Sequence, residues 1–304
     1  MAETFSIGEA LAAPVRVIRR HPLAVFVWGL TMVLFSLALS ALVFGSLADL
    51  PLTQAGSAEP PPEFLGRMMA FQGVSMLANL GQVALSIIIW TATMRATLRI
   101  GRPDRYFFMR AGMDELRVGV VGVALFFGAY IAVIVLVLLG VAIGAVAWQA
   151  NEALAILLGF LMMLGLIAAV IYAMARLSLI APATLILERF AFVEGWNLAK
   201  GRVGSLLGLL ICTWLIYMAI YLVIAFFAIL AVFASGVFAH MQAVEQAVTF
   251  RDLMPPPGVI AGLVVVLIGP GAFLYGAVMT LLCAPFASAC RQLLDGSPQG
   301  ALEA

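Results

Sequence analysis

The chain has 304 residues, of which 64% are hydrophobic and only 10% are charged, and its formal net charge is +1. Soluble domains carry roughly 45–50% apolar and about 25% charged residues, so this composition excludes a soluble globular protein and predicts an integral membrane protein. The net charge gives no indication of a nucleic-acid partner.

Six nearly uncharged runs recur along the chain, and each is long enough to cross a hydrocarbon core of roughly 30 Å as a helix. They show no strand-like alternation, and in lipid every backbone polar group must be satisfied within its own segment. The first run is too long for the apolar core of a cleaved signal peptide. The sequence therefore predicts an all-α polytopic transmembrane helix bundle, one domain over residues 1–304 with a short cytoplasmic tail at 293–304. Its predicted spans are 23–47, 71–94, 118–148, 153–175, 203–238 and 259–289.

Lysine and arginine are distributed unevenly between the two sides of this predicted bundle. Fourteen of the sixteen lie in the N-terminal segment, the second and fourth connections and the segment after the last span, whereas only Arg67 and Arg251 lie on the other side. Because loops rich in lysine and arginine stay in the cytoplasm, both termini are predicted to be cytoplasmic. Arginines on this side are candidates for contact with lipid headgroups; those candidates are Arg95, Arg99, Arg176 and Arg202.

Three similar stretches precede the first, third and fifth spans: "FSIGEALAAPVRVIRRHPLAVFVWGL" from Phe5, "FMRAGMDELRVGVVGVALFFG" from Phe108 and "FVEGWNLAKGRVGSLLGLLICTW" from Phe192. In each, an aromatic residue is followed by glycine, an acidic or amide residue, leucine and then basic residues. This pattern predicts parallel repeats, each an interfacial helix followed by a transmembrane hairpin, over 1–100, 101–185 and 186–292. Chance similarity between membrane sequences is the alternative.

The second span carries an unusual number of polar side chains on one helical face. At 100° per residue they fall within an arc of about 80°. An unpaired amide in hydrocarbon costs several kcal/mol, so this stripe is expected to face protein or water. It either forms interhelical hydrogen bonds or lines a wetted cavity or ligand groove. Its members are Gln72, Ser75, Asn79, Gln82 and Ser86, followed by Thr93 and Thr97.

The sixth span contains Gly269, Pro270 and Gly271 near the expected bilayer midplane. Proline removes a backbone donor and kinks a helix, so carbonyl groups freed there could meet Asn79 and Gln82 of the second span. The stripe and this break are therefore candidates for lining one groove. Pairs of glycines at four-residue spacing predict close helix packing, within the chain or between protomers; they are Gly140 and Gly144, Gly204 and Gly208, and Gly258 and Gly262.

The middles of the predicted spans carry no Asp, Glu, Lys or Arg, which disfavours a transporter driven by buried carboxylates. The chain shows no catalytic motif, its three cysteines lack metal-ligand spacing, and neither a cofactor nor a metal is expected. Acidic residues on the arginine-rich side are either a phosphate-handling cluster of an enzyme or topology determinants in ion pairs. They are Asp104, Asp114, Glu115, Glu188 and Glu194.

The stretch "ARLSLIAPATLILERFAFVEGWNLAKGRVGSLLGLL", residues 175–210, resembles the glycerophosphoryl diester phosphodiesterase membrane domain family and its six-span bacterial relatives. The likeness rests on Arg176, Pro182, Glu188 and Glu194, with an aromatic residue between the two glutamates and a polar turn into the next span. It implies a membrane module of the bacterial inner membrane, without the soluble phosphodiesterase domain that does the chemistry in some members. No catalytic residue is carried over.

The expected function is therefore non-catalytic: binding or organising membrane phospholipid, or a membrane protein partner or second copy of the chain, through the polar intramembrane groove. The alternative is a transporter or channel-like permease for a small or amphiphilic solute.

Overall fold

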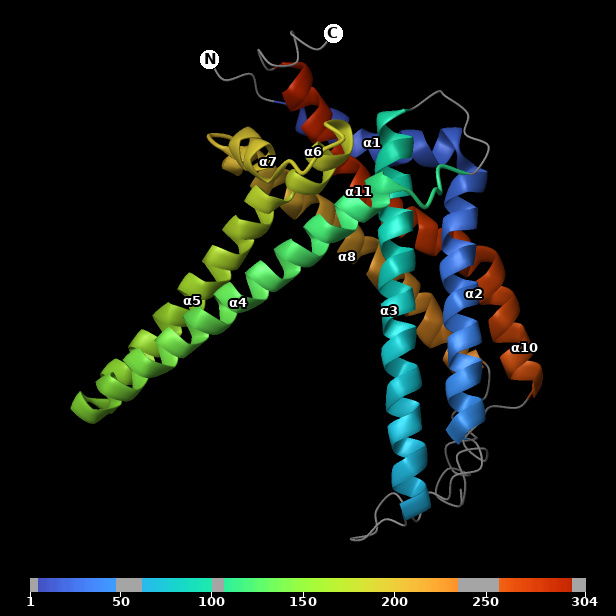
Figure 1. The fold of residues 1–304 in the computed structure, drawn as a ribbon, viewed down its shortest axis with the longest axis horizontal. Coiled ribbons are helices and arrows are strands. Elements are labelled where there is room, and N and C mark those ends of the chain that lie inside the picture. Colours follow the sequence, from blue (N-terminus) through green and yellow to red (C-terminus); the bar gives the residue numbers. More distant parts are fainter. Residues whose placement is uncertain (1–4, 48–61, 100–106, 235–256, 297–304) are drawn as a thin grey trace. The chain divides into compact units, whose positions relative to one another are not determined.

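The computed structural model describes residues 5–47, 62–99, 107–234 and 257–296, and within these ranges it contains helices and no strands (Figure 1). Six of its helical stretches are long and apolar enough to cross a membrane, which confirms the predicted all-α polytopic helix bundle and makes the chain a multi-pass membrane protein. The helices are α1 (Ile7–Arg20), α2 (Pro22–Leu47), α3 (Pro62–Leu98), α4 (Met113–Ala150), α5 (Glu152–Leu177), α6 (Ile180–Ile186), α7 (Phe192–Ala199), α8 (Val203–Ala234), α10 (Pro257–Val266), the π-helical η3 (Leu267–Gly271) and α11 (Ala272–Asp295).

The helices extend beyond the runs that hydropathy predicts. The second predicted span, 71–94, lies within α3, whose 37 residues would extend about 55 Å at 1.5 Å per residue. Hydropathy identifies only the apolar part of a helix, so the polar ends of the same helix are not included in the predicted span. Residues 235–238 of the fifth predicted span lie outside the described residues.

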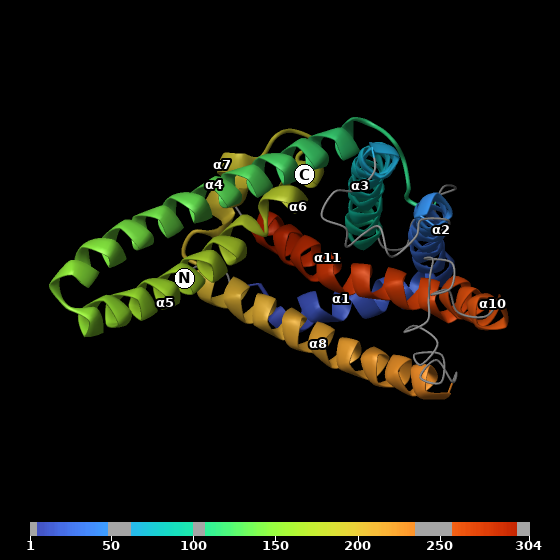
Figure 2. The ribbon, with the colours of Figure 1, turned by 90° about the horizontal axis from the view of Figure 1, so that it is seen from below.

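Helices α4 and α5 form a hairpin that is closed by a single residue, Asn151 (Figure 1 and Figure 2). The Asn151 side-chain oxygen accepts hydrogen bonds from the backbone nitrogens of Ala153, at 2.8 Å, and Leu154, at 3.3 Å. These bonds satisfy two of the free N–H groups at the start of α5, as an N-cap does. Asn151 thus connects the two spans without a longer loop. This agrees with the short connection, 149–152, between the third and fourth predicted spans.

The chain divides into two compact units, one of residues 1–17, 91–214 and 281–304 and the other of residues 18–90 and 215–280. The first unit, called unit 1 below, has a core made largely of alanines from α1, α5, α7 and α11, with Leu206 and Leu209 of α8. Small side chains let these helices approach closely. The charged ends of the helices in unit 1, with Arg95, Arg99, Arg117, Arg176, Arg202 and Arg291, are called the arginine-rich end.

The second unit, unit 2, contains α2, most of α3, the later part of α8, and the α10–η3–α11 span up to residue 280. Here α2 packs on the start of α11, and Trp28 and Met32 of α2 are buried. The predicted break is a π-helical turn that contains Pro270. In a π turn the backbone hydrogen bonds follow the i→i+5 pattern. This local change of pattern accommodates a proline, which has no N–H group to donate.

The predicted glycine pairs do not mark the closest helix packing. A Cβ atom at Gly144, Gly204, Gly258 or Gly262 would meet no other group within 4 Å in the described structure. Gly140 and Gly208 have only the tips of flexible side chains nearby. The tight contacts lie instead at isolated glycines, above all Gly29 of α2 and Gly276 of α11.

The three stretches of the predicted repeat differ in local structure. The first contains α1, a 14-residue helix with a buried face and arginines in its last turn, and the third contains the short helix α7. In the second, residues 107–112 form an irregular turn that leads directly into α4. The threefold repeat stays a prediction.

Candidate functional site

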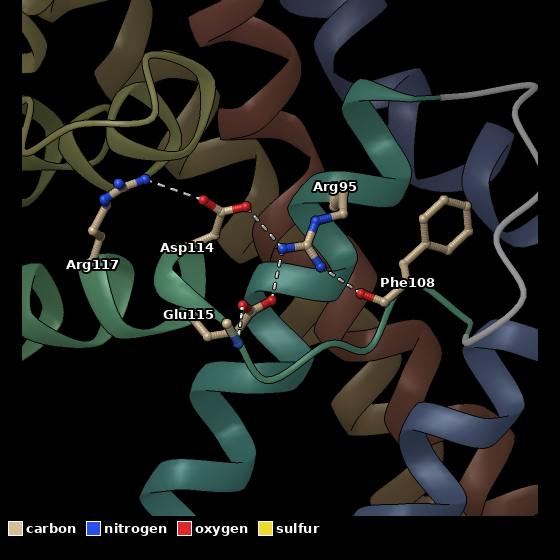
Figure 3. A network of polar contacts seen from close by, with 6 residues as sticks. Arg95, Phe108, Asp114, Glu115 and Arg117 are labelled. Atoms are coloured by element: carbon tan, nitrogen blue, oxygen red, sulfur yellow. Dashed lines mark hydrogen bonds and ion pairs between the residues drawn. The ribbon is translucent and has the colours of Figure 1, made fainter.

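Arg95, in the last turn of α3, lies at the centre of a buried polar network (Figure 3). Its side chain is only 6% exposed. One guanidinium nitrogen, Nη1, donates to the backbone oxygen of Phe108 at 2.8 Å, and the other, Nη2, donates to Oε1 of Glu115 at 2.7 Å. Nη2 also lies 3.4 Å from Oδ2 of Asp114. The charge of Arg95 is therefore matched within the protein.

The sequence around the start of α4 places these partners. Gly112 is the N-cap of α4, and Oε2 of Glu115 accepts a hydrogen bond from the Gly112 backbone nitrogen at 3.0 Å. Acidic residues in a first turn are stabilised by the partial positive charge at a helix N-terminus. Glu115 therefore caps its own helix with one oxygen and binds Arg95 with the other.

The turn before α4 is strained. Phe107 and Phe108 have φ angles of 53° and 63°, in the left-handed region that bulky residues rarely adopt. Such a conformation persists where surrounding contacts hold it. Here the bond from Arg95 to the Phe108 oxygen supplies one of those contacts, so Arg95 joins the end of α3 to the turn before α4.

A partly enclosed pocket of about 300 Å³, the charged pocket, lies beside this network in unit 1. The ends of α3 and α11, the start of α4 and the C-terminal end of α6 form its walls. Charged and apolar side chains both line it. The lining residues are Arg95, Leu98, Arg99, Asp114, Leu185, Ile186, Glu188, Arg291, Leu294 and Asp295.

The arginines of the charged pocket differ in how far their charges are matched. Arg291 donates to the backbone oxygen of Leu98, and its Nε lies 3.7 Å from Oδ2 of Asp295. Arg99 is exposed and forms no ion pair with any residue that the structure describes. Among the residues that the structure describes, Arg99 is therefore the arginine of this pocket without an acidic partner.

Two of the four predicted headgroup arginines, Arg95 and Arg99, line the charged pocket, whereas Arg176 and Arg202 do not. The guanidinium carbon of Arg176 lies 4.0 Å from the centroid of the Trp196 ring, and its Nη1 donates to the Tyr172 hydroxyl at 2.9 Å. This cation–π contact joins α5 to α7. Arg202 donates to the backbone oxygen of Leu198 at 3.4 Å, just before α8.

The predicted polar stripe runs along α3, most of it in unit 2. Gln72 and Asn79 are exposed, Ser75, Gln82 and Ser86 are partly buried, and Thr93 and Thr97 are buried. Two of the hydroxyl groups are satisfied within the helix: Ser86 donates to the backbone oxygen of Gln82 at 2.7 Å and Thr97 to that of Thr93 at 2.8 Å.

The stripe and the predicted break at Gly269, Pro270 and Gly271 both belong to helices that contact α2. Gly81 of α3 packs on the ring of Phe35, and Ala272, directly after the π turn, packs on Gly29. The contacts that the structure describes thus join each helix to α2, and a shared groove between stripe and break stays a prediction.

Sequence reasoning missed part of the charged pocket. In the sequence, Leu185, Ile186 and Leu294 are not distinguished from other apolar residues. Arg291 enters only the count of basic residues that predicts which side of the membrane is cytoplasmic. The ion pairs of Asp114 and Glu115 with Arg95 agree with the interpretation of these acidic residues as members of ion pairs, although Glu115 is buried rather than solvated. Asp104 lies outside the described residues. No spacing of residues along the chain indicates that the ends of α3, α6 and α11 meet.

Comparison with known proteins identifies no relative: no family model, no curated protein and no solved structure matches the chain. The resemblance of residues 175–210 to the glycerophosphoryl diester phosphodiesterase membrane domain family therefore stays a prediction.

Proposed function

We propose that this multi-pass membrane protein binds phospholipid headgroups without catalysis, through the charged pocket, with its arginine-rich end facing the cytoplasm of a bacterial inner membrane. The observation that carries this proposal is the presence of Arg99, an arginine without an ion pair among the described residues, in a cavity of about 300 Å³ whose other walls include Leu98, Leu185, Ile186 and Leu294. A phosphate group suits the arginine, and the glycerol and first acyl carbons suit the leucines and isoleucine.

The position of the charged pocket along the chain also supports the proposal. Its walls are the ends of α3 and α11 and the start of α4, and each of these belongs to a helix long enough to cross a membrane. Arginines at the end of an apolar span are typical of the level of the lipid headgroups, and each arginine near an anionic leaflet contributes about 1 kcal/mol of attraction.

The contacts of the acidic residues favour binding over chemistry. Asp114 lies 3.4 Å from both Arg95 and Arg117, and Glu115 is bound to Arg95 and to the Gly112 backbone. Carboxylates held by arginines in this way are already occupied by ion pairs and hydrogen bonds, and they fix the shape of the network beside the pocket. The segment that resembles the membrane-module family, residues 175–210, supplies Leu185, Ile186 and Glu188 to the walls.

The Arg99→Gln variant tests this proposal. Loss of a charge-assisted hydrogen bond to phosphate is expected to lower the phospholipid affinity about tenfold, because such bonds contribute at least about 1.4 kcal/mol. Native mass spectrometry of the protein in gentle detergent, titrated with phospholipid, measures this. Arg16→Gln is the matched control, since Arg16 lies on α1 outside the pocket and pairs with Glu9. Equal lipid binding by the two variants would contradict the proposal.

A further inference from the structure

The charges that line the charged pocket leave one cation and one anion unmatched. Arg95 is bound to Asp114 and Glu115, and Arg291 lies 3.7 Å from Asp295. Of the remaining lining residues, Arg99 and Glu188 are charged and exposed, and neither forms an ion pair with any residue in the described ranges. A ligand that neutralises both must carry a negative and a positive group.

Glu188 occupies an unusual backbone position at the wall of this pocket. It comes directly after Leu187, the C-cap of α6, and has a φ of 50°. This left-handed position after a helix is the one that glycine normally fills, because a side chain there is disfavoured. A carboxylate is thus present at the pocket in spite of the backbone preference, and non-glycine residues in such conformations cluster at ligand contacts.

From these two observations we infer that the charged pocket is selective for a phosphoethanolamine headgroup, with its phosphate at Arg99 and its primary ammonium at Glu188. This inference rests on the proposed function and names the class of phospholipid. The apolar wall residues, among them Leu185 and Leu294, favour the lipid over the free headgroup because they offer apolar surface to the glycerol and first acyl carbons.

The lining also discriminates against other headgroups. A phosphoglycerol headgroup has a phosphate for Arg99 but leaves the Glu188 carboxylate facing a neutral, hydroxylated group. A phosphocholine headgroup has a positive charge, but its quaternary ammonium lacks N–H donors and is recognised best by aromatic side chains. None of the residues that line the described pocket is aromatic. A primary ammonium can donate hydrogen bonds to Glu188 directly.

The Glu188→Gly variant separates the role of the carboxylate from the stability of the fold. Glycine adopts the left-handed conformation without strain, so the variant is expected to unfold at a temperature no lower than that of the wild-type protein. Its preference for phosphatidylethanolamine over phosphatidylglycerol is expected to fall about tenfold, as loss of a charge-assisted hydrogen bond predicts. Native mass spectrometry with an equimolar mixture of phosphatidylethanolamine, phosphatidylglycerol and phosphatidylcholine of identical acyl chains measures the preference.

Two controls make the result specific. Glu188→Gln keeps the backbone strain and removes the charge, so it should lose the preference as Glu188→Gly does. Arg189→Gln changes the neighbouring residue, which pairs with Glu194 at 3.2 Å, and should keep the preference. Lipid binding with an unchanged preference in Glu188→Gly would overturn the inference and leave the proposed function standing. Absence of lipid binding by the wild-type protein would overturn both. Saturation by soluble phosphoethanolamine at the same concentrations as the lipid would overturn the assignment to a lipid headgroup.

Discussion

Replacement of Gly29 or Gly276 with alanine is expected to destabilise the protein by about 3 kcal/mol or more, because either methyl group would collide with backbone in the α2–α11 crossing. A Cβ atom at Gly29 would lie 1.7 Å from the backbone oxygen of Ala272, and one at Gly276 would lie 2.0 Å from that of Val25. Backbone atoms inside two packed helices cannot rotate away as a side chain can. The helices would have to separate.

The melting temperature in detergent measures this effect, and the chain offers matched controls. Gly45 of α2 and Gly262 of α10 lie in open space, where a Cβ atom would meet nothing within 4 Å. Because alanine favours a helix over glycine by up to about 1 kcal/mol, Gly45→Ala and Gly262→Ala should melt at or above the wild-type temperature. If Gly29→Ala melted like Gly45→Ala, the described crossing of α2 and α11 would be wrong.

Loss of Arg95 is the second change with a large expected effect. Arg95→Leu leaves Glu115, whose side chain is 7% exposed, without its cation and removes the donor to the Phe108 oxygen. Removing one partner of a buried pair typically costs about 3–5 kcal/mol, since the other charge stays buried and unmatched. The strained turn at Phe107 and Phe108 would also lose one of the contacts that hold it.

A double-mutant cycle in detergent, with stability as the readout, tests this argument. Arg95→Leu with Glu115→Leu should be more stable than Arg95→Leu alone, because the second change removes the unmatched carboxylate. Arg16→Leu is the comparison at an exposed pair, where Arg16 and Glu9 lie 3.9 Å apart, and should cost at most about 1 kcal/mol. Additive losses from Arg95→Leu and Glu115→Leu would show that the two side chains do not act as a buried pair.

The fold of this protein could be predicted from its sequence because hydrocarbon imposes a simple requirement on composition. The predicted span 23–47 is α2 within one residue at its start, and the predicted span 153–175 lies inside α5. Pro270 likewise indicated the break at η3, since proline removes a backbone donor wherever it stands in a helix. These features depend on one segment at a time.

The candidate site depends on segments far apart in the sequence, and hydropathy carries no information about which helix ends meet. Leu98, Ile186 and Leu294 line one pocket although nothing in their local sequence distinguishes them from other apolar residues. Glycine spacing did not identify the tight contacts within the chain for a related reason, and packing of the glycine pairs between protomers stays a prediction. Gly29 and Gly276 are tight because each faces backbone of another helix, whereas the four-residue pairs that predicted a seam include glycines that face open space.

The central claim, that phospholipid occupies the charged pocket, is tested most directly by photo-crosslinking in native membranes. The probe is a phosphatidylethanolamine with a diazirine on a methylene carbon near the glycerol end of one acyl chain, and the readout is the set of cross-linked tryptic peptides. Cross-links are expected in residues 177–189, which contain Leu185 and Ile186, and in the peptide that contains Leu294, with a lower yield in Arg99→Gln. Cross-links confined to the exposed surfaces of α4 and α5, with none in these two peptides, would contradict the account.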